Sequence, residues 1–235
     1  MNTDRFANVL GEDYNLFKKS LPDYDSFQDK IGDIVKKYTS SINRDTILVV
    51  EGGTGTGLTA YRILNADKRI KVIGIDNEEK LLKQARVVLA EYGDRIELKH
   101  KDLLEALKDI TSESADVFAS AWVIHNLTSD YRVKLFPEIA RVLKKGGLFV
   151  NVDKYAQDDL VLHNQDLNKQ IKAFEVFDEI KRPDLKKEWT KHYDEDNKIK
   201  FTEKEQMDFL KEQRFTNIIS SDRKVMDTIF TAIKE

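Results

Sequence analysis

Short apolar runs alternate with longer amphipathic stretches along the middle of the chain. Five runs have the length and branched apolar content of strands: 44–51, 70–76, 96–99, 116–121 and 148–152. The stretches between them carry apolar residues at helical spacing and predict helices over 56–66, 78–92 and 130–145. Because the apolar runs are nearly continuous, we expect both faces of each strand to be buried, as in a parallel sheet. The alternation predicts a doubly wound α/β fold.

Several sequence features predict how the helices begin and end. Residues 27–38 carry one apolar face and predict a helix before the first strand. Gly93 is expected to stop the helix over 78–92. Pro137 is expected to break or kink the helix over 130–145, whose end has two lysines and then two glycines, residues 144–147. After the fifth strand, the segment 154–200 is charged and helix-prone and has no strand pattern.

The last part of the chain predicts one helix and two strands. Residues 201–213 resemble a helix with Thr202 as its N-cap and Glu205 as the capping-box partner. Strands are predicted over 215–220 and 225–233, with four polar residues between them. Because this connection is short, the two strands are expected to pair antiparallel at the edge of the sheet.

Composition narrows the class of protein without defining a function. The 235 residues are 40% hydrophobic and 34% charged, with a formal net charge of −3. This balance gives no general electrostatic reason to expect a nucleic-acid partner. No apolar run is long enough for a membrane span, the first residues lack a signal-peptide core, and cysteine is absent. We therefore expect a cytoplasmic protein without a thiolate nucleophile, cysteine-held zinc or an iron–sulfur cluster.

A glycine-rich turn follows the first predicted strand. The sequence of residues 51–57 is Glu-Gly-Gly-Thr-Gly-Thr-Gly, and it does not match the dinucleotide pattern because Leu58 stands at the third glycine position. Asp76 ends the second strand, at the spacing that suits a carboxylate binding ribose hydroxyls. Asp102 follows the third strand and could accept from an exocyclic amine. The alternative is that both acids only cap the helices that follow them.

These motifs resemble those of the class I S-adenosylmethionine-dependent methyltransferases, over residues 44–152 and the terminal strand pair. Residues 51–57 look like the motif that wraps the methionine part of the cofactor. Residues 120–127 are similar to the segment after strand four, and 143–150 resemble the Leu-Lys-Pro-Gly-Gly turn, with Lys145 at the proline position. Arg214 is a departure, because the family often has glycine there.

The resemblance implies a seven-stranded sheet of order 3-2-1-4-5-7-6, with strand 7 antiparallel and a helical lid inserted after strand 5. It divides a single domain into an N-terminal cap (1–43), a cofactor-binding core (44–152), the lid (153–200) and a final helix with two strands (201–235). Asp76 would bind the ribose and Asp102 the adenine amine. The cofactor-binding residues implied are Glu51, Gly52, Gly53, Thr54, Gly55, Gly57, Asp76, Asn77, Asp102, Leu103, Ala121 and Trp122.

The acceptor side of the site is less visible in the sequence, because methyl transfer mainly requires alignment of donor and acceptor. His125 is the candidate general base, and the alternative is that it only shapes its turn. The candidate acceptor residues are Tyr14, His125, Trp189 and Tyr193, although Trp189 and Tyr193 could simply dock the lid and Tyr14 could fold over the cofactor. No metal is expected, since His163 and His192 lack a ligand spacing.

The expected activity is methyl transfer from S-adenosylmethionine to a small molecule, with S-adenosylhomocysteine as the product. Residues 120–123 lack the Asn-Pro-Pro-aromatic segment of enzymes that methylate base or amide nitrogens, which favours a small acceptor. A homodimer is compatible with the sequence. Two alternatives stay open: a carboxy-S-adenosylmethionine synthase-like enzyme, which needs cationic groups beside the cofactor, and a non-catalytic binding protein.

Overall fold

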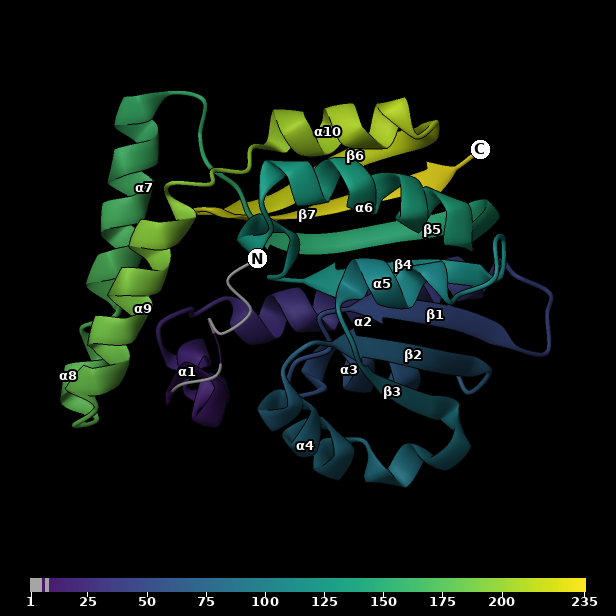
Figure 1. Cartoon of the computed structure of the whole chain (residues 1–235), viewed down its shortest axis with the longest axis horizontal. Helices are drawn as coiled ribbons and strands as arrows, with labels where there is room; N and C mark the ends of the chain where they lie inside the picture. The colour runs from purple at the N-terminus through teal and green to yellow at the C-terminus, as the bar shows by residue number, and fades with distance from the viewer. Residues whose placement is uncertain (1–5, 7–8) are drawn as a thin grey trace.

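Seven strands form a single sheet within the part of the chain that the computed structural model describes, which is residue 6 and residues 9–235 (Figure 1). Their order is β3-β2-β1-β4-β5-β7-β6, and β7 is antiparallel to both of its neighbours. The predicted strand order is therefore confirmed. The strands are β1 (Ile47–Gly52), β2 (Ile70–Asp76), β3 (Ile96–His100), β4 (Ala115–Ala121), β5 (Leu143–Lys154), β6 (Phe215–Lys224) and β7 (Asp227–Lys234).

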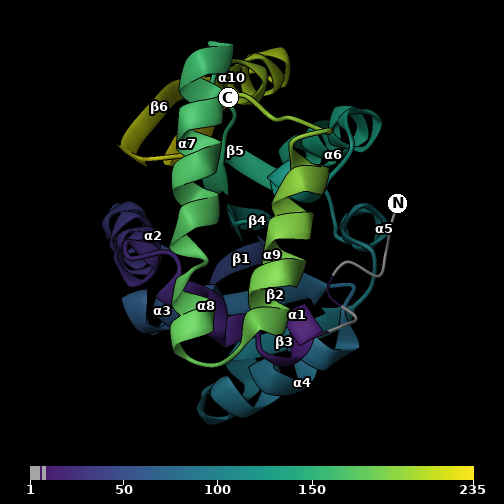
Figure 2. The same ribbon diagram turned by 90° about the vertical axis from the view of Figure 1, so that its left-hand side faces the viewer.

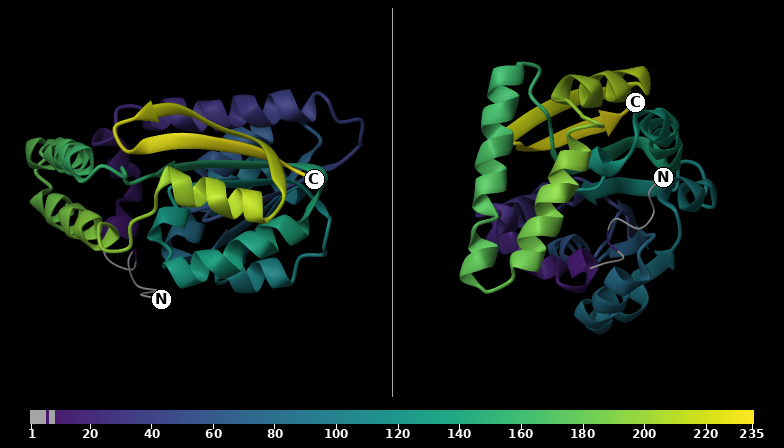
Figure 3. Two further views of the ribbon diagram at one scale, coloured as in Figure 1. Left: turned by 90° about the horizontal axis from the view of Figure 1, so that it is seen from above. Right: turned by 60° about the vertical axis from the view of Figure 1, so that its left-hand side comes forward.

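Helices cover both faces of the sheet and produce three layers (Figure 3, left). One core lies under α2, α3 and α4, and the other lies under α5, α6 and α10. Neighbouring residues of β1 divide between them, since Val49 belongs to the first core and Val50 to the second. These helices are α2 (Tyr24–Thr39), α3 (Leu58–Ala66), α4 (Glu79–Val88), α5 (Leu103–Lys108), α6 (Ser129–Val142) and α10 (Glu203–Glu212).

The segment between β5 and α10 forms a helical insertion at the carboxyl ends of the parallel strands (Figures 1 and 2). Its long helices, α7 (Leu160–Ala173) and α9 (Pro183–Asp196), lie side by side and are joined through α8 (Val176–Glu179). The N-terminal segment, with α1 (Val9–Glu12) and the 3₁₀ helix η1 (Tyr14–Lys19), packs against α9. None of the helices in the described residues is long and apolar enough to cross a membrane.

Helix α6 is shorter than its sequence predicts. It runs through Pro137 and ends at Val142, and β5 begins at the next residue, so the prediction of a helical basic last turn at 144–145 is wrong. The reason is long-range pairing: Leu143 pairs with Ala115 of β4, and Lys144 donates to Asp116 at 2.8 Å. Helix α4 likewise ends at Val88 and is followed by a 3₁₀ segment, η2 (Ala90–Arg95).

The hairpin between β6 and β7 turns later than predicted. Lys224 pairs with Asp227, so the connection is Val225 and Met226 rather than the polar residues before them. Those polar residues continue β6 through a bulge, at which Asp222 has φ 59°. The helix before the hairpin is confirmed in detail, because Thr202 and Glu205 form the predicted capping box of α10.

Candidate functional site

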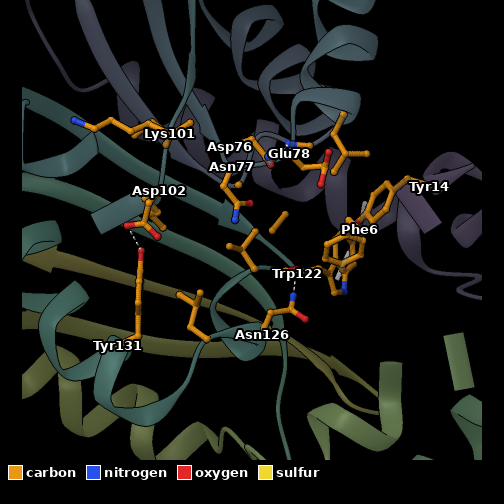
Figure 4. A pocket seen from close by; sticks show the side chains of 18 of the residues that line it. Phe6, Tyr14, Asp76, Asn77, Glu78, Lys101, Asp102, Trp122, Asn126 and Tyr131 are labelled. Atoms are coloured by element: carbon orange, nitrogen blue, oxygen red, sulfur yellow. Dashed lines mark hydrogen bonds between the residues drawn. The ribbon is translucent and has the colours of Figure 1, made fainter. Parts of the chain in front are cut away.

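A cavity of about 280 Å³ opens at the carboxyl ends of the parallel strands, between the sheet, the N-terminal segment and the insertion (Figure 4). Open α/β sheets bind ligands at this edge, where the strand order reverses. Nine of the residues predicted from sequence line the cavity: Tyr14, Gly53, Gly55, Asp76, Asn77, Asp102, Leu103, Ala121 and Trp122. The sequence motifs therefore meet in one place.

The glycine-rich turn has a shape that other residues would disrupt. Gly53 has φ 73°, and a β-carbon built on it would lie 2.1 Å from a methyl group of Val123. The amide of Gly53 donates to Ile75 at 2.8 Å, which holds β1 against β2 beyond the last strand residue. Gly57 has φ 86° and is the N-cap residue directly before α3. The turn thus leaves bare backbone at the cavity, where a ligand can approach closely.

Asp76 joins the turn to the end of β2. One carboxylate oxygen accepts from the amide of Gly55 at 2.7 Å, and the other accepts from the amide of Glu78 at 2.8 Å. Burial raises the pKa of Asp76 to about 6, although these two hydrogen bonds act in the opposite direction. A carboxylate has about four acceptor positions, so Asp76 can still accept from two ligand hydroxyl groups.

Glu51 supports the turn from behind. It is buried, does not line the cavity, and accepts a hydrogen bond from Thr54 Oγ1 at 2.8 Å. Burial raises the pKa of Glu51 to about 7, with a smaller contribution from the negative charge of Asp76. Gly52, Thr54 and Gly57 are likewise absent from the cavity wall. These predicted cofactor residues therefore shape the turn without lining the cavity.

Asp102 both caps a helix and lines the cavity, so its capping role leaves it placed for the contact with adenine, which stays a prediction. Its Oδ1 accepts from the amide of Glu105 at 3.1 Å, at the start of α5. The same oxygen accepts from the hydroxyl of Tyr131 at 2.8 Å, and that hydroxyl accepts from the amide of Leu104 (Figure 4). This network orients the carboxylate at the end of the cavity next to Leu103.

The turn after β4 forms the floor of the cavity. Trp122 has φ 55°, an uncommon backbone conformation for a bulky residue. Its indole donates to Asp227 at 2.8 Å and stacks on Tyr24 with ring centroids 4.6 Å apart. The side-chain amide of Asn126 donates to the Trp122 carbonyl at 3.1 Å (Figure 4). These contacts hold a strained backbone at the cavity.

Aromatic side chains join the N-terminal segment to the insertion. Trp189 lies against Phe17, with ring centroids 4.1 Å apart, and Phe174 contacts Tyr193 edge-on. Neither Trp189 nor Tyr193 lines the main cavity, whereas Tyr14 does. Contact of Trp189 and Tyr193 with an acceptor stays a prediction, and their observed contacts join the two segments that border the cavity.

His125 lies in a buried network of ion pairs. Its Nδ1 contacts Asp153, and its Nε2 lies 3.5 Å from Asp196 of α9. Lys154 Nζ also contacts Asp196. Burial, the largest single effect, opposes protonation of His125, but Asp153 and Asp196 together outweigh it and raise the pKa of the imidazole. His125 lines a separate cavity of about 20 Å³ and not the main one, so the predicted general base is placed behind the cavity wall.

The same network contains a group with metal-ligand chemistry. The ligand atoms of His125, His192 and Asp196 lie within 4.8 Å of one another. The ammonium group of Lys154 contacts the Asp196 oxygen that such an ion would use. We therefore treat the group as an ion-pair network that connects α9 to the sheet, and the expectation of no metal stays a prediction.

Sequence reasoning did not find every residue of the cavity wall. Asn126 lies within the segment 120–127, and Glu78 follows the predicted residues Asp76 and Asn77, so their positions in the sequence could have marked both residues. Phe6 and Glu195 come from the N-terminal segment and α9, and no local pattern marks them. Their positions depend on how distant segments pack.

Comparison with known proteins agrees with this geometry. Residues 49–147 match a family model described as a methyltransferase domain. A carboxy-S-adenosyl-L-methionine synthase of Nautilia profundicola is 26% identical over 160 residues, which are 66% of this chain and 61% of that protein. The matched part thus spans less than two thirds of that relative.

Solved structures show the same fold at low sequence identity. An O-methyltransferase family protein from Burkholderia thailandensis superposes with a TM-score of 0.68 and 13% identity, covering 98% of this chain and 62% of the other. Haemonchus contortus phosphoethanolamine N-methyltransferase 2, in complex with S-adenosyl-L-methionine, superposes with a TM-score of 0.60 and 14% sequence identity. The superposition covers 87% of this chain and 52% of the other.

The strand order, the glycine-rich turn and the acids that end β2 and follow β3 are arranged as in the methyltransferase fold. Together with the match of residues 49–147 to the methyltransferase-domain model, they make the chain similar to the class I S-adenosylmethionine-dependent methyltransferases.

Proposed function

We propose that this protein transfers a methyl group from S-adenosylmethionine to a small-molecule acceptor, within the cavity between the sheet and the insertion. The observation that carries the proposal is the position of Asp76. Its carboxylate is fixed by the amides of Gly55 and Glu78 at the cavity wall. This is the arrangement that a ribose diol requires, because a fixed carboxylate can accept both hydroxyl hydrogen bonds.

The remaining wall fits the other parts of the cofactor. The bare backbone at Gly53 and Gly55 leaves room for the methionine portion, and Glu51 behind it adds negative charge. Asp102 and Leu103 offer an acceptor and an apolar surface for adenine. When bound, S-adenosylmethionine supplies an electrophilic methyl group on a sulfonium. The protein's contribution is then to align the acceptor and to exclude water.

His125 is proposed to position the turn after β4 rather than to contact the acceptor. Its backbone amide donates to Asp153 at 3.2 Å, and its ring contacts the same carboxylate. These contacts hold the segment that carries Trp122 and Asn126 at the cavity. A proton-transfer role would require a path through Asn126 or the small second cavity.

A second candidate activity is that of a carboxy-S-adenosylmethionine synthase, because curated relatives carry this name. A carboxylated ligand would need a cation beside it. Among the described wall residues the cation is Lys101, and its ammonium group pairs with Asp109 at 2.5 Å. Four carboxylates line the same cavity: Asp76, Glu78, Asp102 and Glu195. This charge distribution favours methyl transfer.

Calorimetric titration with S-adenosylmethionine, S-adenosylhomocysteine and NAD tests the cofactor assignment. Wild type should bind the first two and not NAD. Asp76→Asn should weaken binding about 100-fold, since charged hydrogen bonds contribute about 1.5–3 kcal/mol each. Asp94→Asn is the matched control, because Asp94 is an exposed acid on η2. Binding that is unchanged in Asp76→Asn would contradict the proposal.

Mass spectrometry of the nucleotide that co-purifies with the protein separates the two enzymatic candidates. S-adenosylmethionine or S-adenosylhomocysteine is expected, and a nucleotide heavier by one carboxyl group would favour the synthase. The non-catalytic alternative is favoured instead if the protein binds the cofactor but releases no S-adenosylhomocysteine with any acceptor in a screen.

A further inference from the structure

Tyr131 lies in the wall of the main cavity, and its hydroxyl group is engaged as both donor and acceptor. The hydroxyl donates to Asp102 Oδ1 at 2.8 Å and accepts from the amide of Leu104 at 2.8 Å. Figure 4 shows the hydroxyl and the carboxylate directed at each other. Burial, and to a smaller extent Asp102, raises the pKa of Tyr131, so the hydroxyl keeps the proton that it donates. With this proton committed to Asp102, the hydroxyl is placed to act on a ligand through that carboxylate.

The two oxygens of Asp102 have different surroundings. Oδ1 accepts from two donors, the hydroxyl of Tyr131 in α6 and the amide of Glu105 in α5, which lies 3.1 Å away. Within the part of the chain that the structure describes, Oδ2 accepts no hydrogen bond. Because Asp102 lines the cavity, Oδ2 is the acceptor that it offers to a ligand. The two donors to Oδ1 fix the orientation of the group.

An oxygen that only accepts hydrogen bonds can discriminate between purine bases. Adenine carries an amino group at C6, which is a donor, whereas guanine and hypoxanthine carry an oxygen there, which is an acceptor. A 6-oxo purine would place this oxygen against Oδ2 of Asp102, where two acceptors repel each other. A site that forms a hydrogen bond with one group of its ligand discriminates strongly against an analogue that lacks the group, because its own polar atom is left unpaired.

We propose that Tyr131 is a positioning residue that makes the cofactor site selective for adenine over 6-oxo purines, an inference that rests on the proposed binding of S-adenosylmethionine. By holding Oδ1 of Asp102, Tyr131 directs Oδ2 at the amino group of the base. Inosine and guanosine derivatives are thereby disfavoured on the nucleoside side of the cavity. If the hydroxyl only joined α6 to the start of α5, its removal would weaken the binding of every nucleoside equally.

Titration with S-adenosylhomocysteine and S-inosylhomocysteine, which carries a 6-oxo group in place of the 6-amino group, measures this selectivity. Wild type should bind the adenosyl compound at least about 30-fold more tightly, since hydrogen bonds to charged groups are strong. Tyr131→Phe keeps the ring but removes one donor to Oδ1, and it should reduce the preference about tenfold by weakening the adenosyl compound alone. Tyr38→Phe is the matched control, because the Tyr38 hydroxyl donates to the carbonyl of Gly146 at 2.8 Å and Tyr38 does not line the cavity.

Asp102→Asn separates orientation from a merely structural role. Asparagine is also a good N-cap residue, so the start of α5 should be retained. The two donors to Oδ1 require the amide oxygen at that position, which turns the amide nitrogen toward the base. A donor then faces C6, and the preference should reverse in favour of S-inosylhomocysteine. In Asp102→Asn/Tyr131→Phe only one donor fixes the side chain, so the reversal should be about fivefold smaller.

The two proposals fail in different ways. If S-adenosylhomocysteine does not bind the folded wild type, the proposed function is contradicted. If it binds and Tyr131→Phe weakens both compounds equally, or neither, the positioning role of Tyr131 is overturned. If Asp102→Asn prefers S-adenosylhomocysteine as strongly as wild type does, the orientation assigned to the carboxylate is wrong.

Discussion

At the scale of single residues, the two carboxylates beside the glycine-rich turn are held in an environment that disfavours their charge. The pKa of Glu51 is raised to about 7 and that of Asp76 to about 6, in both cases mainly through burial. Ionisation of either carboxyl group therefore reduces the stability of the ligand-free protein. A cationic ligand such as S-adenosylmethionine would compensate that cost.

Glu51→Gln should stabilise the ligand-free protein at pH 8 and have little effect at pH 5. Because the folded-state pKa lies above the ordinary value of 4.5, the folded protein holds this proton more strongly than the unfolded chain. The associated stability is present below pH 4.5 and is lost as the pH rises through about 7. The loss is up to about 3 kcal/mol at 1.36 kcal/mol per pKa unit. Calorimetric unfolding of wild type and Glu51→Gln at pH 5 and pH 8 measures this difference in the free energy of unfolding. An equal difference at the two pH values would contradict the explanation.

Arg214 stands where the similar methyltransferases often have glycine, and the backbone conformation at this position accounts for that glycine. It precedes β6 with φ 59°, a left-handed conformation that glycine adopts without a steric penalty. Arg214→Gly should therefore leave the fold unchanged and offset backbone strain of about 1 kcal/mol, less the added entropy of the unfolded chain. We expect a small rise in Tm, measured by differential scanning calorimetry. Lys181→Gly, at another left-handed position, provides a comparison.

At the scale of elements, the insertion is joined to the sheet by buried charge as well as by aromatic packing. Lys154 at the end of β5 and Asp196 at the end of α9 have side chains only 6% and 5% exposed. His125 and Asp153 complete the network from the sheet side. The position of α9, and of Glu195 on it, depends on these contacts.

Lys154→Met should destabilise the protein by about 3–5 kcal/mol, because it leaves Asp196 buried without its lysine. The double variant Lys154→Met/Asp196→Asn should recover part of that loss, and urea unfolding of the full cycle gives the coupling. Lys204→Met is the control, since the Lys204–Asp208 pair is largely exposed and should contribute less than about 1 kcal/mol. A similar loss of stability in Lys154→Met and Lys204→Met would show that the buried ion pair contributes no more than the exposed one.

The elements differ in how far local sequence could predict them. Strand β2 and the capping box of α10 follow the predicted residues, because their signals are local. The end of α6 does not, because residues 143–145 have a helical pattern while Leu143 pairs with β4. Pairing with a distant strand overrides local helix preference. The late turn of the β6–β7 hairpin has a different origin, because Lys224 pairs with the nearby Asp227.

At the scale of the whole molecule, the cavity is assembled from segments far apart in the chain. The motifs on β1, β2 and β4 could be predicted to meet, because parallel strands end at one edge of a sheet. The positions of Phe6 and Glu195 in the cavity wall could not, because they depend on the packing of the N-terminal segment against α9. The cofactor side was thus more visible in the sequence than the acceptor side.

S-adenosylhomocysteine should raise the Tm of the whole domain. At 100 times its dissociation constant, a ligand that binds only the folded state adds about 2.7 kcal/mol. For a chain of this length, that corresponds to a shift of about 6 °C. Asp76→Asn at the same ligand concentration should show a much smaller shift, measured by thermal scanning. Equal shifts in both proteins would indicate that the ligand binds elsewhere.

The position of Phe6 has a practical consequence for assays. This residue forms part of the cavity wall only five residues after Met1. Strand β7, in contrast, ends at Lys234 on the opposite edge of the sheet, where Ile233 pairs with the first part of β5 (Figure 1). A fluorophore or other bulky label attached close to Phe6 therefore stands at the cavity, whereas a label attached close to Lys234 stands away from it. Labelling on the β7 side is the arrangement in which binding constants will report the unobstructed cavity.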